Sequence, residues 1–463
     1  MIIKRLQITK LYDIYNYDII FNDDLSFLYG VNGSGKTTIL NILTYIIKGK
    51  FYDLKQYKFK KCTVFFDDLT GKKSITISND KFNVKSNYFN LNFKITQFRK
   101  NKFYTLEPIY QKNLKAYINS FNYLFLPLSR EAFVNTLRSD LLRSDLFLFH
   151  DHHFIQKPAT ISNYKTNFLN ENLPDYQTYL DSSLENVKDL IKKHCFMIAT
   201  KENGYNEIFR KKLIETLLSI DMPYSIEEAL AFKYKKDIKQ IIEDKKSSIT
   251  ETIKKFLKLD NSTSNLLISK ISKKFDILYD SIKNLKNAKD IEVETLSQYL
   301  WHYGEIKKLE SLYNLGQELS QEMNTFYQRK ELFLKIINSF FDLSQNYKKI
   351  NIHPNGDIEL SLNYQEKRKS LDIKHLSSGE KHLLIIFANL IFNMKQDTTG
   401  IYIVDEPEAS LHLKWQANFV KSLKEATNNI QLIFATHSPE IINKYRDKMI
   451  KIQADINGSD FDE

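Results

Sequence analysis

Short runs of alternating or continuous apolar residues occur near both ends of the chain, and their length is typical of β-strands. In the N-terminal part they cover residues 2–8, 19–21, 25–28, 62–66, 74–77 and 123–127. Segment 37–47 differs, because its apolar residues recur at helical spacing and the run stops before Gly49. The run 25–28 leads directly into a glycine-rich loop at 30–35, so the pattern predicts a strand, a loop and a helix in succession.

The middle of the chain, residues 130–345, is charged, poor in glycine and helical in pattern. Its clearest apolar stripe covers 309–340, about 48 Å of helix at ~1.5 Å per residue. Gly316 and Lys330 occupy positions where the stripe should continue. We interpret the segment as a long helix packed in a bundle, in preference to a free coiled coil. The stripe consists of Leu309, Leu312, Leu319, Met323, Phe326, Phe333, Ile337 and Phe340.

Strand patterns return after residue 345. Runs at 350–352 and 358–362 flank a turn at 353–357, and a helix at 379–394 precedes strands at 401–404 and 431–435. We therefore predict an α/β fold whose head is formed by both chain ends and is interrupted by a helical insertion. The expected domains are 1–130, 131–345 and 346–463.

Composition limits the function classes. Sixty-seven Lys and Arg against 56 Asp and Glu give a net charge of +11, which permits a polyanionic partner but fits a biased composition equally well. Cys62 and Cys195 are the only cysteines, which excludes a disulfide scaffold and a cysteine zinc site. The start lacks a signal-peptide pattern, and no apolar run reaches the roughly 20 residues of a membrane span. We expect a cytoplasmic protein without membrane association.

Residues 30–37 read Gly-Val-Asn-Gly-Ser-Gly-Lys-Thr and match the pattern G-x-x-x-x-G-K-[ST] between a strand and a helix. Such glycines let backbone amides converge on phosphate oxygens at the start of the helix, so an ordinary glycine-rich turn is disfavoured. Lys36 is expected to reach the β- and γ-phosphates and Thr37 to hold Mg²⁺. The predicted contacts of this loop are Gly30, Asn32, Gly33, Ser34, Gly35, Lys36, Thr37 and Thr38.

Two acidic residues follow the predicted strand 401–404. Asp405 is placed to hold Mg²⁺, either directly or through its water shell, and Glu406 to polarise or deprotonate the attacking water. Alone, such a pair after a strand would be a common surface feature. Together with the phosphate loop, it indicates a catalytic site.

Two further motifs complete the pattern. Residues 376–380, Leu-Ser-Ser-Gly-Glu, precede a helix and form a second potential anion site, too close in sequence to Asp405 to serve the same phosphates easily. His437 directly follows a predicted strand and has the position of a γ-phosphate sensor. A lone His there would more often be structural, but beside the other motifs we favour a functional role.

Together these motifs resemble the ABC-type P-loop ATPase heads of RecF, SMC and overcoming-lysogenization-defect (OLD) proteins. In that comparison 30–37 resembles the Walker A loop, 376–380 the signature motif, 405–406 Walker B, 408–412 the D-loop and His437 the switch histidine. The resemblance implies ATP and Mg²⁺ as cofactors and a homodimer or higher oligomer joined through the heads. In such a dimer Ser377 and Gly379 of one subunit close the ATP site of the other.

The same resemblance assigns further contacts. Ser378 and Glu380 join the nucleotide contacts, although they depart from the usual L-S-G-G-Q signature, where Gly and Gln stand. Ser410 of the D-loop is expected near the nucleotide. Gln97 is a candidate for the glutamine that contacts the metal.

Residues 376–381 and 405–412 look most like the ATPase subunits of bacterial antiphage systems such as Septu, PARIS and some retrons. OLD nucleases continue past the switch histidine into a TOPRIM domain, whereas 26 residues (463 − 437) follow His437 here. The resemblance therefore implies a slow, regulatory ATPase that controls a separately encoded nuclease.

Other interpretations remain open at this stage. A RecF-like DNA-binding repair ATPase would use the +11 charge, with nucleic acid as partner. A transporter ATPase is disfavoured, because 341 residues (377 − 36) separate Lys36 from the signature motif. The cluster His150-Asp-His-His153 is interpreted as a structural or partner-facing turn, with a metal site as the alternative, and Arg130 could contact phosphate or the insertion.

Overall fold

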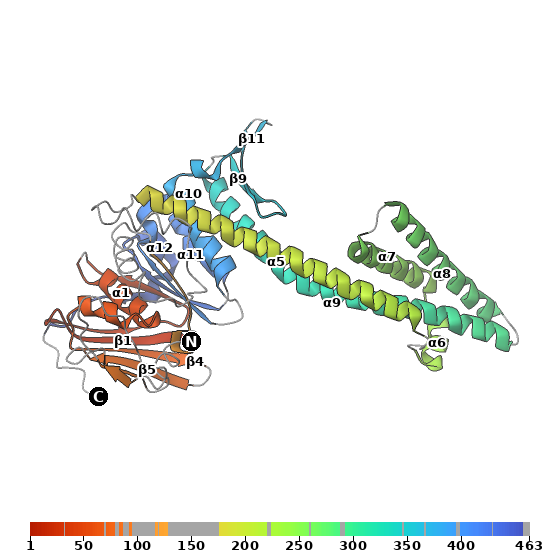
Figure 1. Cartoon of the computed structure of the whole chain (residues 1–463), viewed down its shortest axis with the longest axis horizontal. Coiled ribbons are helices and arrows are strands. Elements are labelled where there is room, and N and C mark those ends of the chain that lie inside the picture. Colours follow the sequence, from red (N-terminus) through yellow and green to blue (C-terminus); the bar gives the residue numbers. More distant parts are fainter. Residues whose placement is uncertain are drawn as a thin grey trace, which may run out of the picture. The chain divides into compact units, whose positions relative to one another are not determined.

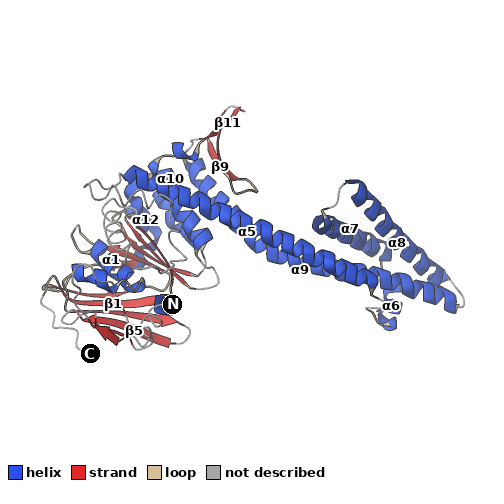
Figure 2. Cartoon of the chain, in the orientation of Figure 1, coloured by secondary structure: helices blue, strands red, loops and turns tan. Residues whose placement is uncertain are grey.

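The computed structural model describes residues 1–31, 33–68, 71–78, 83–86, 92–94, 116–118, 120–127, 176–219, 224–258, 261–287, 292–344, 347–364, 367–394, 399–427 and 429–456. The chain divides into two compact units (Figures 1 and 2). Unit 1 comprises Met1–Lys193 and Glu331–Glu463, and unit 2 comprises His194–Lys330. Unit 2 covers fewer residues than the insertion expected at 131–345, because both ends of that segment belong to unit 1.

Unit 1 contains an antiparallel sheet built from the N-terminal part of the chain. Its strand order is β2-β1-β4-β5-β6-β7. The residues directly opposite one another include Leu6 and Val64, both fully buried, so one face of the sheet is apolar. The strands are β1 (Ile2–Leu11), β2 (Tyr15–Ile20), β4 (Lys61–Asp68), β5 (Gly71–Ser78), β6 (Asn83–Ser86) and β7 (Asn92–Lys94).

A parallel sheet in the same unit combines both ends of the chain. Its order is β14-β3-β13-β12-β8, and every neighbouring pair is parallel. The strands are β3 (Leu25–Tyr29), β8 (Asn122–Pro127), β12 (Gly400–Asp405), β13 (Ile430–Ala435) and β14 (Met449–Lys451). Because parallel strands have their carboxyl ends at one edge, the loops after β3, β12 and β13 all begin there. The predicted α/β fold with a head formed by both chain ends is confirmed.

Helix α1 (Lys36–Ile47) and the short helix η1 (Phe51–Gln56) join the two sheets into one core. The apolar residues of α1 belong to one buried cluster with residues of β1 and β4 and with Ile401, Ile403 and Ile433 of the parallel sheet. Gln431, fully buried on β13, links the sheets directly. Its side chain accepts a hydrogen bond from Ile3 N at 2.8 Å and donates to Ile3 O and Asn22 O, each at 2.8 Å.

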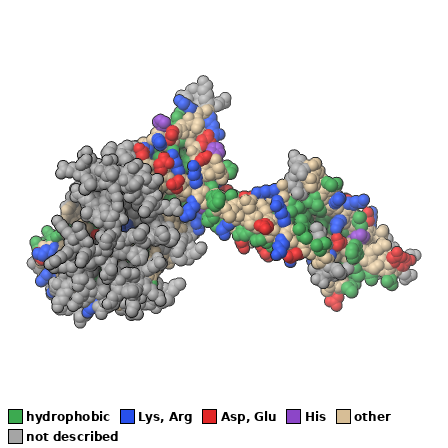
Figure 3. Space-filling model, viewed as in Figure 1, with side chains coloured by type: hydrophobic (Ala, Val, Ile, Leu, Met, Phe, Trp, Pro, Cys, Tyr) green, Lys and Arg blue, Asp and Glu red, His purple; other side chains and the backbone are tan. Residues whose placement is uncertain are grey.

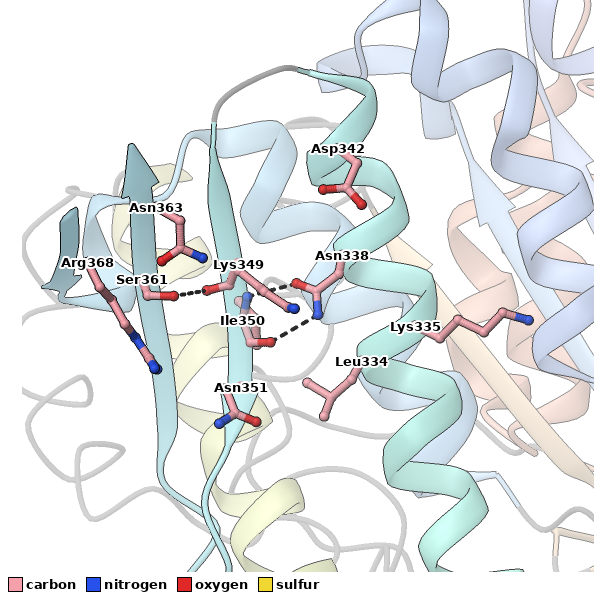
Figure 4. A pocket seen from close by; sticks show the side chains of 10 residues that line it. All are labelled: Leu334, Lys335, Asn338, Asp342, Lys349, Ile350, Asn351, Ser361, Asn363 and Arg368. Atoms are coloured by element: carbon pink, nitrogen blue, oxygen red, sulfur yellow. Dashed lines mark hydrogen bonds between the residues drawn. The ribbon is translucent and has the colours of Figure 1, made fainter. Parts of the chain in front are cut away.

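A third, smaller sheet has the order β11-β10-β9 and contains the predicted hairpin. Its strands are β9 (Lys348–Ile352), β10 (Ile358–Tyr364) and β11 (Lys367–Leu371). The edge strand β9 is capped by Asn338, whose side chain bonds to both Ile350 N at 2.8 Å and Ile350 O at 3.0 Å. Beside this contact lies an open pocket of about 600 Å³ between helix α9 (Val293–Leu343) and the sheet, lined among others by Lys349 and Arg368 (Figure 4). Of the predicted nucleotide residues that the structure describes, none lines it.

The remaining elements of unit 1 follow β11. They are η2 (Ile373–His375), α10 (Ser378–Ala388) continued by the π-helical turn η3 (Asn389–Asn393), η4 (Pro407–Ser410), α11 (Leu413–Ala426), α12 (Pro439–Ile442) and η5 (Asn443–Lys448). The predicted helix at 379–394 corresponds to α10 and η3.

Unit 2 is helical and has a core of its own. Two long helices, α5 (Tyr176–Leu218) and α9 (Val293–Leu343), contribute residues to both units, and α6 (Ile226–Lys233), α7 (Ile238–Leu257) and α8 (Asn261–Asn287) lie between them in sequence. Residues of all five helices form one buried cluster, which agrees with a packed bundle. The stripe predicted at 309–340 lies within the 51 residues of α9. Gly316 lies on the packed side of this stripe and not at a break in it. A Cβ there would lie 2.2 Å from Thr252 Cγ2 of α7, so the close approach of α7 leaves no room for a side chain.

Across the part of the chain that the structure describes, no helix is both long enough and apolar enough to cross a membrane.

Candidate nucleotide site

The glycine-rich loop connects β3 with α1 at the carboxyl edge of the parallel sheet. Gly33 and Gly35 have φ of 81° and 90°, a backbone conformation that favours glycine. Gly35 also lies against β2 of the antiparallel sheet, because a Cβ there would be 2.9 Å from the Tyr17 hydroxyl. That hydroxyl donates a hydrogen bond of 3.0 Å to Ser34 O. The conformation predicted from the glycine spacing is therefore fixed by a neighbouring strand as well.

Lys36 is buried, with 7% of its surface exposed. Its Nζ donates hydrogen bonds to Gly30 O at 3.0 Å and Val31 O at 3.3 Å, so the ammonium group lies within the curve of the loop. Burial lowers the pKa of Lys36, and the negative charges of Asp405, Glu406 and Glu408 oppose that effect. This is the location in which a lysine reaches phosphates held by the loop.

The start of α1 has the features of an anion-binding helix terminus. Gly35 is the N-cap and offers no side-chain cap, and no acidic residue lies in the first turn. The first amides of a helix have no partner within the helix and carry the positive end of its dipole. Thr37 and Thr38, both half-buried, lie in this turn. The described residues therefore suit a phosphate group here.

Asp405 brings the second motif to the same place. It is the last residue of β12 and is 2% exposed. Burial raises its pKa to about 7, a hydrogen bond with the Thr37 side chain opposes this, and the nearby Glu406 and Glu408 carboxylates add to it. Asp405 Oδ1 is buried without a hydrogen-bond partner, as is Ser34 Oγ in the loop. A carboxylate oxygen without a partner beside a threonine hydroxyl suits a cation.

The residues present fit Mg²⁺ only in combination with a nucleotide. In the described part of the chain, no three His, Cys, Asp or Glu side chains gather in a way that could hold a metal ion. Mg²⁺ is commonly bound by one or two protein ligands together with substrate phosphates and water. Thr37 and Asp405 could supply the protein ligands, and bound Mg²⁺ would neutralise charge on the phosphate oxygens.

Glu406 follows Asp405 in a left-handed conformation, with φ of 49°. Its backbone N donates to Ala435 O at 2.9 Å, which ties the end of β12 to the end of β13. The side chain is half-buried. Its predicted action on the attacking water stays a prediction.

The turn after β13 is held by Glu408, a residue that the sequence placed in the D-loop without a specific role. Glu408 accepts hydrogen bonds from Thr436 Oγ1 at 2.9 Å and from His437 N at 2.6 Å. His437 itself is exposed. The geometry therefore joins the D-loop to the switch histidine. Sequence reasoning missed Thr436, although a polar residue directly after a buried apolar strand was a usable signal.

The signature motif forms the start of α10. Ser377 is the N-cap and makes a capping box with Glu380, in which each side chain bonds to the other residue's backbone N. Ser377 and Ser378 are exposed, whereas Gly379 is buried. No hydrogen bond or ion pair among the described residues joins 377–379 to the phosphate loop of the same chain.

Glu380 is turned inward, so the structure gives its departure from the usual glutamine a structural reason. Its carboxylate is 2% exposed and pairs with Lys348 Nζ of β9, at 2.9 Å to each oxygen. The next residue, Lys381, is also 2% exposed and pairs with Asp181 of α5 at 2.7 Å. The geometry favours a supporting role for Glu380, and its predicted nucleotide contact stays untested.

Several predicted residues cannot be placed. Asn32, Gln97, Arg130 and the cluster 150–153 lie outside the described residues, and for Ser410 only its backbone position in η4 is described.

Comparison with known families identifies the family of the chain. The family model described as "AAA domain, putative AbiEii toxin, Type IV TA system" matches residues 25–443, which include every motif described above. The chain belongs to this family. The ATPase resemblance predicted from the motifs is thereby confirmed at the level of the family.

Curated relatives share shorter segments. The chain is 25% identical over 300 residues to "Retron Vc95 probable ATPase" of Vibrio cholerae, covering 61% of this chain and 54% of the relative. It is 28% identical over 145 residues to "Retron Ec83 probable ATPase" of Escherichia coli, covering 29% and 26%. A match to "Septu protein PtuA" of Bacillus mycoides is 33% identical over 72 residues, covering 14% and 10%. The chain thus spans about half or less of the relatives it matches.

Among solved structures, the Smc head domain with a coiled coil and joint from Pyrococcus yayanosii matches with 15% identity and a TM-score of 0.37, covering 95% of this chain and 93% of that one. The SMC head domain from Thermotoga maritima gives 10% identity and a TM-score of 0.37, covering 96% and 91%. Scores this low carry no argument, so the fold rests on the strand order given above.

Proposed function

We propose that this chain is a magnesium-dependent ATPase that dimerises through its heads when ATP binds, and that this dimer controls a separately encoded nuclease in an antiphage complex. The observation that carries the ATPase part is the contact between Thr37 and Asp405. It joins the phosphate loop to the end of β12, with Asp405 Oδ1 left without a hydrogen-bond partner. Lys36, the free start of α1 and Glu406 complete the arrangement that phosphoryl transfer requires.

The dimer is supported by the signature motif. Ser377 and Ser378 are exposed at the start of a helix, where hydroxyl and backbone donors can bind an anion. They make no described polar contact with their own phosphate loop. A second copy would bring this helix start to the nucleotide held by the first.

The defence role is supported by the relatives, which are named as retron ATPases and Septu proteins. The nuclease partner rests on resemblance to such systems and not on a contact in the structure.

The first experiment measures ATP binding and hydrolysis by the purified chain with and without Mg²⁺. Lys36→Ala should lose binding, and Glu406→Gln should bind ATP, hydrolyse it slowly and accumulate as a dimer in light scattering. Lys414→Ala, an exposed lysine on α11, is the matched control and should behave as wild type. Full hydrolysis by Lys36→Ala would refute the assigned site, and a monomer at saturating ATP would refute the dimer.

The second experiment tests the biological role by phage plating of cells that carry this gene with its natural neighbour. Protection that disappears with Lys36→Ala would support ATP-dependent defence. Absence of protection across a broad phage panel would contradict it.

A DNA-binding repair ATPase is the second candidate, supported by the net charge of +11. On the face shown in Figure 3, basic and acidic side chains are interspersed over the helical part without forming one basic patch. ATP-stimulated DNA binding that falls steeply with salt would favour this candidate.

A further inference from the structure

Glu408 uses both of its carboxylate oxygens to hold one turn. Oε1 accepts a hydrogen bond of 2.6 Å from His437 N, and Oε2 accepts one of 2.9 Å from Thr436 Oγ1. Glu408 lies in η4, three residues after Asp405 at the end of β12, whereas the two donors follow β13. A carboxylate that accepts from a backbone N–H and a hydroxyl makes charge-assisted bonds, which are stronger than neutral ones. Glu408 therefore fixes the backbone on which the His437 ring is mounted.

The rest of the turn is rigid for the same reason. Thr436 is fully buried, and its Oγ1 also accepts from Ser438 N at 3.0 Å. Ser438 Oγ donates to Gln416 Oε1 of α11 at 2.6 Å and caps α12 by accepting from Ile441 N at 3.2 Å. Within this network the His437 side chain is the exposed member. Hydrogen bonds from both sides leave the turn little freedom to reorient that side chain.

We propose that Glu408 is a positioning residue for ATP hydrolysis, which acts by holding His437 in the orientation needed at the γ-phosphate. This inference rests on the proposed function, in which His437 senses that phosphate. The competing explanation is electrostatic, because the Glu408 charge lies near enough to Lys36 and Asp405 to influence both groups. The hydrogen bonds separate the two explanations, since Thr436 can be changed without removing a charge.

The test compares variants of the full-length chain by steady-state ATP hydrolysis and by binding of a fluorescent ATP analogue. Glu408→Ala should lower kcat by about tenfold or more while nucleotide affinity changes less than about threefold, because the residue acts on orientation and not on binding. Thr436→Val keeps the charge and the side-chain shape but removes the hydroxyl, and should lower kcat by about three- to tenfold. Glu408→Gln retains one acceptor oxygen and should lie between Glu408→Ala and wild type. Glu440→Gln, which removes an exposed carboxylate in the same turn region, is the control.

A double-mutant cycle with His437→Ala decides the mechanism. If Glu408 acts through His437, the double variant should be no slower than His437→Ala alone. Additive losses, or an unchanged kcat in both Glu408→Ala and Thr436→Val, would overturn the proposal while leaving the ATPase assignment intact. Wild-type kcat in His437→Ala would overturn both the sensor role and this inference. Wild-type hydrolysis no faster than that of Lys36→Ala would identify failure of the proposed function itself. Thermal unfolding of each variant shows whether a loss of kcat reflects misfolding. If Glu408→Ala does not fold, Thr436→Val alone decides the test.

Discussion

Replacing Asp405 with Asn should stabilise the nucleotide-free protein at neutral and alkaline pH. Burial raises the pKa of Asp405 from its ordinary 3.8 to about 7. A carboxyl group with a raised pKa in the folded state favours folding when protonated, so that stability is present below pH 3.8 and is lost as pH rises to 7. The difference of about three pH units corresponds to about 4 kcal/mol at ~1.36 kcal/mol per unit, an upper bound for the wild-type chain.

An asparagine at this position cannot ionise, so the loss should be absent from the variant. The gain of Asp405→Asn over wild type should increase by about 2 kcal/mol between pH 5.5 and 7, the part of the titration inside that window, and level off above it. With Mg²⁺ and ATP present, the wild type should become more stable than Asp405→Asn, because a ligand that binds only the wild-type site stabilises only the wild-type fold.

Urea unfolding in EDTA measures this difference. The chain has two tryptophans, and Trp415 on α11 of unit 1 is 5% exposed, so a Trp301→Phe background leaves one buried reporter. Asp24→Asn is the control. Partial burial raises the pKa of Asp24, but its ion pairs with Lys448 and Lys424 outweigh this and lower it, so both states stay ionised above pH 5.5. A stability difference for Asp405→Asn that does not change between pH 5.5 and 8.5 would refute the reasoning.

Three further changes test the packing. Gln431→Leu should destabilise unit 1 by about 2–4 kcal/mol in urea unfolding, because it leaves the backbone groups it joined between the two sheets without partners; an unchanged midpoint would contradict its linking role. Asp181→Ala should destabilise unit 1 by about 1–3 kcal/mol more than Lys381→Met does. The alanine leaves the buried Lys381 ammonium group unpaired, whereas the methionine removes that charge. Equal losses of stability in the two variants would argue against the ion pair. Gly316→Ala should destabilise unit 2 by about 1–3 kcal/mol through overpacking and should therefore lower its melting temperature. Gly204→Ala should not lower it, because a Cβ there meets nothing within 4 Å. The same shift in melting temperature for both variants would refute the close contact at Gly316.

The phosphate loop could be predicted from the sequence because its conformation is local. Gly33 and Gly35 supply the positive φ values, and the flanking strand and helix follow the hydrophobic pattern. The alignment of Asp405 with that loop was also accessible, since carboxyl ends of parallel strands share an edge. These predictions depended on residues whose neighbours are close in sequence or fixed by strand direction.

Other features depend on contacts that no local pattern records. The stripe of α9 appeared interrupted at Gly316, because the reason for glycine there is the approach of α7. The ion pair of Glu380 with Lys348 was not predicted, since nothing near Glu380 in sequence indicates that Lys348 lies opposite. Strand β11 has the sequence Lys-Arg-Lys-Ser-Leu and lacks apolar alternation, so pairing with β10 and not its own pattern defines it.

The arrangement of the parallel sheet also determines when the site can form during synthesis. Gln431 and Ile3 lie 428 positions apart in the chain, yet they hydrogen-bond across the two sheets of unit 1. At roughly 5–20 residues per second, a ribosome needs on the order of 20–90 s between the two residues. Strand β3 lacks β13, its neighbour in the sheet, until the end of that interval, and by then the whole of unit 2 has been made. The apolar strand next to the phosphate loop therefore stays exposed to the cell until the last segment arrives, and an interrupted translation product would contain a glycine-rich loop without Asp405, Glu406 or His437 beside it.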